Sequence, residues 1–147
     1  MTTGIHTAIT EAVKDALNAA VLSESFTVSR VFIPDVELPT SETGTVVRVW
    51  PDPEGRTSKF ETRSRLRRQY PVLVAVLRRC DVGLNSAVDP YIQLLEEIED
   101  LFSGKQLTGN AAATCIGTEQ VIGFSWEAMK RNRQYVGVVK LMFIRVS

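Results

Sequence analysis

Few side chains in this sequence could carry out chemistry. The chain has one histidine, His6, and two cysteines, Cys80 and Cys115. His6 stands at the start of a predicted helix and no Gly-x-Ser-x-Gly elbow is present, so a Ser–His–Asp site is unsupported. These three residues lack the spacing of a zinc site, and two cysteines are too few for a disulfide scaffold. We expect both cysteines to pack as small hydrophobic residues.

The patterns for phosphate and metal binding are also incomplete. Gly104-Lys105 is followed by Gln106 instead of Ser or Thr, and Glu99 occupies the upstream glycine position of a phosphate-binding loop. A metal site made of carboxylates needs two converging sets, but four acids share the outer face of one predicted helix: Glu96, Glu97, Glu99 and Asp100. The sequence therefore predicts no catalytic, cofactor-binding or metal site, and we expect that the protein is not an enzyme.

Charge is distributed unevenly along the chain. The net charge is zero, yet residues 54–68 contain six positive and two negative side chains, and residues 81–102 contain six acids and no Lys or Arg. In a strand, alternate residues share a face, which puts most of the basic side chains of residues 57–67 on one side. The two segments predict complementary patches, which lie within one chain or on adjacent copies in a head-to-tail ring. The candidate interface residues are Lys59, Glu61, Arg63, Arg65, Arg67, Arg68, Glu96, Glu97, Glu99 and Asp100. The alternative is a solvated edge strand, whose charges only resist aggregation.

The hydrophobic pattern predicts the elements that position these charges. One helix covers residues 5–22 after a cap at Thr2-Thr3-Gly4, and a second begins at Pro90, with Asp89 as its N-cap, and ends before Gly104. A turn at residues 51–55 should fold the basic strand back on the preceding strand as a hairpin. A polar loop fills residues 34–44, and a basic turn fills residues 129–134. The predicted strands are residues 26–33, 45–50, 57–67, 72–79, 115–126 and 135–146.

These elements predict an α+β fold in a single domain spanning residues 1–147. We expect a mostly antiparallel sheet of about five to six strands, with two helices packed on it and a protruding charged hairpin. Residues 72–77 are apolar on both faces, and residues 136–144 are apolar on most of both faces, which is typical of central strands. The first residues lack the features of a signal peptide, and no apolar run is long enough to span a bilayer, so we expect a cytosolic protein with no membrane partner.

Five segments follow one another along the chain after the first helix: VSRVFIPDVELPT, GTVVRVWPDPEGR, YPVLVAVLRR, LLEEIEDLFSGKQL and RNRQYVGVVKLMFIRV. A buried strand thus precedes an acidic helix, and the closing strand follows a basic-polar turn. This order of features resembles that of the tail-completion and tail-terminator proteins of long-tailed bacteriophages. The resemblance covers nearly the full length without a strict motif, and the two combinations just described are its most specific parts.

The resemblance implies a structural virion protein of the tail and neck, assembled in the host cytoplasm. Such proteins form a ring, typically of six copies, that caps the tail tube and joins it to the head–tail connector. The implied partners are further copies of the chain, the tail tube protein and the connector or adaptor protein, with the tail sheath as a further candidate. DNA only passes through the lumen, and no cofactor is implied.

Two other functions remain open. The first is a portal-side head–tail adaptor or stopper of the neck, which the sequence hardly separates from a terminator. The second is a small nucleic-acid-binding domain that uses the basic strand. Single-stranded nucleic acid is commonly held by stacking aromatics, and of the two aromatics nearby, Phe60 is predicted on the opposite face from the basic residues and Tyr70 lies beyond them.

Overall fold

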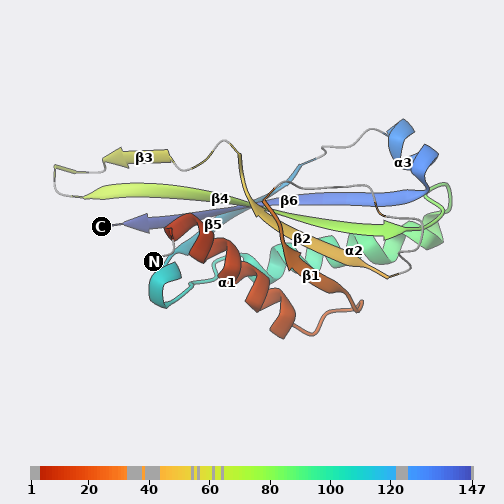
Figure 1. Ribbon diagram of the computed structural model, residues 1–147, viewed down its shortest axis with the longest axis horizontal. Helices are drawn as coiled ribbons and strands as arrows, with labels where there is room; N and C mark the ends of the chain where they lie inside the picture. The colour runs from red at the N-terminus through yellow and green to blue at the C-terminus, as the bar shows by residue number, and fades with distance from the viewer. Residues whose placement is uncertain are drawn as a thin grey trace.

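The computed structural model describes residues 4–32, 38, 44–53, 55, 57–60, 62–63, 65–121 and 126–146. A single six-stranded sheet runs along the molecule, with two long helices beside it (Figure 1). The elements in chain order are α1 (Ile5–Ala19), β1 (Thr27–Arg30), β2 (Val46–Pro51), β3 (Thr57–Phe60), β4 (Leu66–Arg79), α2 (Asn85–Phe102), the 3₁₀ helix η1 (Gly109–Ala111), β5 (Thr114–Val121), α3 (Trp126–Asn132) and β6 (Gln134–Val146).

The strand order is β1-β2-β4-β6-β5, and β3 pairs with the first residues of β4. All neighbouring strands are antiparallel except β1 and β2, which are parallel. The predicted α+β fold, with its mostly antiparallel sheet and two packed helices, is confirmed.

The two longest strands form the centre of the sheet. β4 has 14 residues and β6 has 13, and they pair along most of their length, with Val74 opposite Val139. The side chains of Val74 and Val139 on one face, and those of Ala75 and Leu77 on the other, are all 0% exposed. Such strands need apolar residues on both faces because both faces are covered. The prediction of two central strands is therefore confirmed.

Both long helices pack on the same face of the sheet. The stripe Ile9, Val13 and Leu17 of α1 is buried, as the helical spacing predicted, although α1 ends at Ala19 instead of residue 22. α2 contributes Leu94, Leu95, Ile98 and Phe102 to the same core, together with the inward side chains of β2, β4 and β6. Each fully buried aliphatic side chain of this kind stabilises the fold by about 1.5–3 kcal/mol relative to exposure.

A smaller core lies on the opposite face, around Leu38. This residue packs with Trp50, Ala75, Leu77 and Val138. Its backbone is held at both ends: its N–H donates to Gln134 Oε1 at 2.9 Å, and its carbonyl accepts from Arg79 Nη2 at 2.6 Å. Of the polar loop predicted at residues 34–44, the structure describes only Leu38 and Gly44. Leu38 is 4% exposed and belongs to the core.

The predicted basic strand is wrong in its extent and its partner. β3 ends at Phe60, and the backbone N–H of Arg65 donates to Thr62 Oγ1 at 3.1 Å in the turn that follows. β4 then starts at Leu66 and continues through Pro71, and β2 pairs with β4 instead of β3.

Proline was expected to interrupt this strand, because it has no N–H to donate to a ladder. In an antiparallel ladder, the N–H and C=O of one residue point to the same neighbouring strand. The carbonyl of Pro71 accepts from the N–H of Asp52 at 3.0 Å, so the missing N–H faces the end of β2, beyond Pro51. The ladder between β4 and β6 therefore continues past Pro71.

Three other boundaries differ from the prediction. α2 begins at Asn85, with Leu84 as the N-cap residue, so Asp89 is not the N-cap and Pro90 lies inside the helix. Val88, in the added first turn, packs against the core, which offsets the backbone hydrogen bond that Pro90 cannot donate. Gly104, with φ +74°, ends the helix as predicted.

The predicted strand at residues 115–126 ends at Val121, and Trp126 instead opens α3, which replaces the first part of the predicted basic turn. β1 is also shorter than the predicted strand at residues 26–33, and Phe32, which was predicted within that strand, follows β1 and is 81% exposed.

Candidate interaction surface

The basic residues lie on an extension of the sheet that we call the arm, defined as β3, the described residues of the turn after it, and residues 66–69 of β4. Figure 1 shows the arm extending past α1, with the end of β6 beside it. β3 pairs with β4 from Thr57 opposite Gln69 to Lys59 opposite Arg67. The long strand β4 thus connects the arm directly to the buried core.

The arm is positively charged on both faces. Lys59 is directly opposite Arg67, while Arg68 is opposite Ser58 on β3 and Arg145 on β6. Directly opposite residues share a face, and neighbouring residues point to opposite faces, so Arg67 and Arg68 lie on different sides. Lys59, Arg63 and Arg65 are exposed, and Arg67 and Arg68 are partly buried. The predicted single basic face is therefore replaced by a two-sided basic hairpin, and Glu61 lies outside the described residues.

Two of the four candidate acids on α2 are used within the chain. Glu97 accepts hydrogen bonds from the backbone N–H of Ser23 at 2.9 Å and from Gln93 Nε2 at 3.3 Å. The Ser23 backbone donor is the main reason that the pKa of Glu97 lies below its usual value. Glu99 accepts from Thr118 Oγ1 at 3.1 Å and from Gln120 Nε2 at 2.6 Å. Glu97 thus holds the segment after α1, and Glu99 holds β5.

The other two acids, Glu96 and Asp100, remain exposed on α2. Between described residues, ion pairs join Glu11 to Lys14 and Arg30, and Asp52 to Lys140. None of these pairs connects the arm to α2. The structure therefore does not bring the two sequence-predicted charged patches together by an ion pair in its described part.

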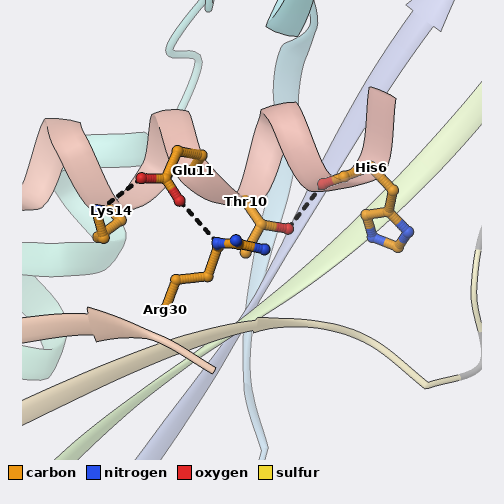
Figure 2. Close-up of polar contacts among 5 residues, drawn as sticks. All are labelled: His6, Thr10, Glu11, Lys14 and Arg30. Carbon is orange, nitrogen blue, oxygen red and sulfur yellow. Dashed lines mark hydrogen bonds and ion pairs between the residues drawn. The ribbon is translucent and has the colours of Figure 1, made fainter. Parts of the chain in front are cut away.

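The start of α1 braces the base of the arm, which the sequence did not predict. His6 Nε2 donates to the carbonyl of Pro71 at 2.7 Å, and its ring makes an edge contact with Tyr70 at a centroid distance of 5.6 Å. Figure 2 shows the polar residues of α1, including Thr10, whose hydroxyl donates to the His6 carbonyl at 2.8 Å. His6 was considered incidental, but it ties α1 to β4 beside the arm.

A second contact visible in Figure 2 joins α1 to β1. Glu11 lies 2.6 Å from Lys14 Nζ and 2.7 Å from Arg30 Nε. The hydrogen bond from Lys14 is the largest cause of the lowered pKa of Glu11. These carboxylate oxygens are occupied by chain contacts, so Glu11 is not part of the candidate surface.

The cavities and thiols offer little reactive chemistry. A groove of about 230 Å³ lies between the first half of α2, α3 and the start of β6, and its lining is mostly aliphatic, including Val88, Leu95 and Met129. Burial raises the pKa of both thiols, Cys80 and Cys115, as expected for cysteines that pack as small hydrophobes. Within the described ranges, no group of three or more His, Cys, Asp or Glu side chains could hold a metal ion. No helix in the described part is both long and apolar enough to cross a membrane.

Comparison with known proteins leaves the chain without an assigned relative: no family model matches it, and no curated protein matches its sequence.

Proposed function

We propose that this protein is a structural component of a bacteriophage tail, a terminator that forms a ring of six copies and caps the tail tube. Its partners are further copies of itself, the tail tube protein and the head–tail connector, with the tail sheath as a further candidate. DNA passes through the ring and is not held by it. The proposal begins from the resemblance of the chain, over nearly its full length, to tail-completion proteins.

The observation that carries the proposal is the separation of charge in a chain of zero net charge. The arm presents exposed basic residues, and α2 presents the exposed acids Glu96 and Asp100. Complementary patches on different elements of one chain suit repeated contact between copies. The groove between α2, α3 and β6 has a mostly aliphatic lining, which gives no particular support to hydrolytic or transfer chemistry.

A second candidate function is nucleic-acid binding, which the basic arm favours. Lys59, Arg63 and Arg65 are exposed and could contact phosphates. DNA binding would leave the exposed acids of α2 without a role, and it is the weaker proposal for that reason.

Deletion of the gene from the phage that encodes it tests the function. Without a terminator, tails should polymerise past their normal length, and DNA-filled heads should accumulate without joined tails in negative-stain images. Normal-length tails with unjoined heads would reject the terminator in favour of a portal-side adaptor or stopper. Normal virions, together with salt-sensitive duplex binding in a mobility-shift assay, would instead indicate a DNA-binding protein.

A further inference from the structure

The arm carries exposed cations, and none of them forms an ion pair with a described residue of α2. Arg63 and Arg65 are exposed in the turn, and Lys59 is exposed on β3. These exposed cations suit an acidic partner, because patches of opposite charge attract each other across an interface.

The outer face of α2 offers such a surface. Glu96 and Asp100 are exposed and four residues apart, which places them side by side on the helix. Two like charges at this spacing destabilise a helix slightly, and an external cation would reverse this effect. Neither side chain makes a hydrogen bond or ion pair with another described residue, whereas Glu97 and Glu99 are occupied within the chain.

We propose that the arm of one copy binds the outer face of α2 on a second copy, through Glu96 and Asp100. This inference rests on the proposed function, because the contact is the one that would join neighbouring copies in the proposed ring. The contact joins two different surfaces, so it is heterologous and adds copies head to tail. It also narrows the acidic side of the interface from four predicted residues to two.

Two charge-reversal variants test this contact. The first carries Arg63→Glu and Arg65→Glu in the turn. The hydrogen bonds between Arg65 and Thr62 are made by backbone atoms of Arg65, so replacing its side chain leaves them in place. The second carries Glu96→Lys and Asp100→Lys on α2. Association of the purified protein is followed by native mass spectrometry and light scattering at about 20 mM and about 500 mM salt, because salt screens exposed pairs.

The wild-type protein should associate beyond a dimer at low salt and dissociate at high salt. Each variant alone should associate at least about tenfold more weakly than the wild type, since several exposed pairs are reversed together. An equal mixture of the two variants should recover assemblies, because each reversed arm then faces a reversed helix. One chain that carries all four substitutions should recover them as well.

Matched controls separate a specific contact from a change in net charge. Lys130→Glu with Arg131→Glu reverses two exposed bases on α3, and Asp15→Lys with Glu127→Lys reverses two exposed acids on α1 and α3. Both controls should associate like the wild type, and all variants should keep the wild-type far-ultraviolet circular dichroism spectrum.

Several results would overturn the proposal. It is wrong if the wild-type protein stays monomeric at low salt, if the controls weaken association as much as the test variants, or if the mixture recovers nothing. An assembly that stops at a dimer would replace the head-to-tail contact with a two-fold one. Loss of duplex DNA binding in the arm variant, with no change in association, would assign the arm to nucleic acid.

These results are independent of the gene-deletion phenotype. Overlong tails in the deletion, with normal tails made by both reversal variants, would keep the terminator function and reject only this contact. Normal-length tails in the deletion would reject the function, while the association measurements would still decide whether the contact exists.

Discussion

Replacement of Gly137 by alanine should destabilise the protein, because the ring of Tyr135 lies over this glycine. Gly137 is in β6, opposite Val76, on the face covered by α2. A Cβ atom at this position would lie 2.6 Å from the Tyr135 hydroxyl oxygen, 3.0 Å from Tyr135 Cζ and 3.0 Å from Leu95 Cδ2. Carbon–carbon contacts are optimal at about 3.5–4.0 Å, so the added methyl group must displace these side chains.

The size of the effect follows from two opposing terms. Overpacking of a core costs about 1–3 kcal/mol. Replacing glycine with alanine restricts the unfolded chain, which stabilises by about 0.4–1 kcal/mol where the backbone permits it. We therefore expect Gly137→Ala to lower the free energy of unfolding by about 1–2 kcal/mol, as measured by urea denaturation with an unchanged slope.

A double-mutant cycle with Tyr135→Phe shows whether the hydroxyl group is the cause. In the phenylalanine background the closest contact is absent, so Gly137→Ala should cost at least about 0.5 kcal/mol less than in the wild type. Equal costs in both backgrounds would refute the role of the hydroxyl group. A Gly137→Ala protein as stable as the wild type would refute the close packing of Tyr135 and Leu95 over this glycine.

Three further predictions test other parts of the structure. Val74→Asp buries an unpaired charge in the central strand and should abolish cooperative folding, which the loss of a thermal unfolding transition would reveal; a soluble, cooperatively melting variant would contradict the position of β4. Glu99→Ala removes the acceptor for Thr118 and Gln120 and should lower the free energy of unfolding by about 1 kcal/mol, as measured by urea denaturation. The exposed control Asp100→Ala should change the free energy of unfolding by less than about 0.5 kcal/mol. Equal effects of the two substitutions would argue against the link between Glu99 and β5. Burial raises the pKa of Tyr135 to about 12, above its ordinary value of 10.0, so its contribution is present below pH 10 and is lost as the pH rises toward 12. Stability measured from pH 9 to 12 should fall less steeply in Tyr135→Phe, and identical profiles would show that Tyr135 ionises equally easily in both states.

The helices and central strands were predictable because burial leaves a period in the sequence. In α1, the spacing of Ile9, Val13 and Leu17 indicates the face that packs on the sheet. In β4, the apolar run indicates that both faces of the strand are buried. The errors arose where local rules were overridden by packing. Pro71 fell between two predicted strands and Pro90 was predicted to start a helix, but both lie inside elements. The missing N–H of Pro71 faces the end of β2, and the core contacts of Val88 offset the hydrogen bond that Pro90 cannot donate.

The candidate surface was predicted only in its composition. Sequence places four acids on one side of α2, but Ser23, the backbone partner of Glu97, is 74 residues away, and the partners of Glu99 are 19 and 21 residues away. No periodic pattern reports such distant hydrogen bonds, so the division between occupied and exposed acids required the fold. The sequence also did not predict that the basic stretch divides into two paired strands. Side chains alternate between the two faces in one long strand and in a hairpin alike, so the pattern does not distinguish them.

The order of the strands also affects how the chain is made. β4 and β6 are neighbours at the centre of the sheet, but residues 80–133 separate them in the sequence. At about 5–20 residues per second, a ribosome needs roughly 3–10 s to synthesise these residues. During this time the edge of β4 that pairs with β6 remains unpaired.

An apolar strand with an open edge readily pairs with other chains, and flanking charges are a common protection. The apolar run of β4 has Arg67 and Arg68 before it and Arg78 and Arg79 after it. The four flanking arginines should therefore disfavour pairing between nascent chains until β6 has been synthesised.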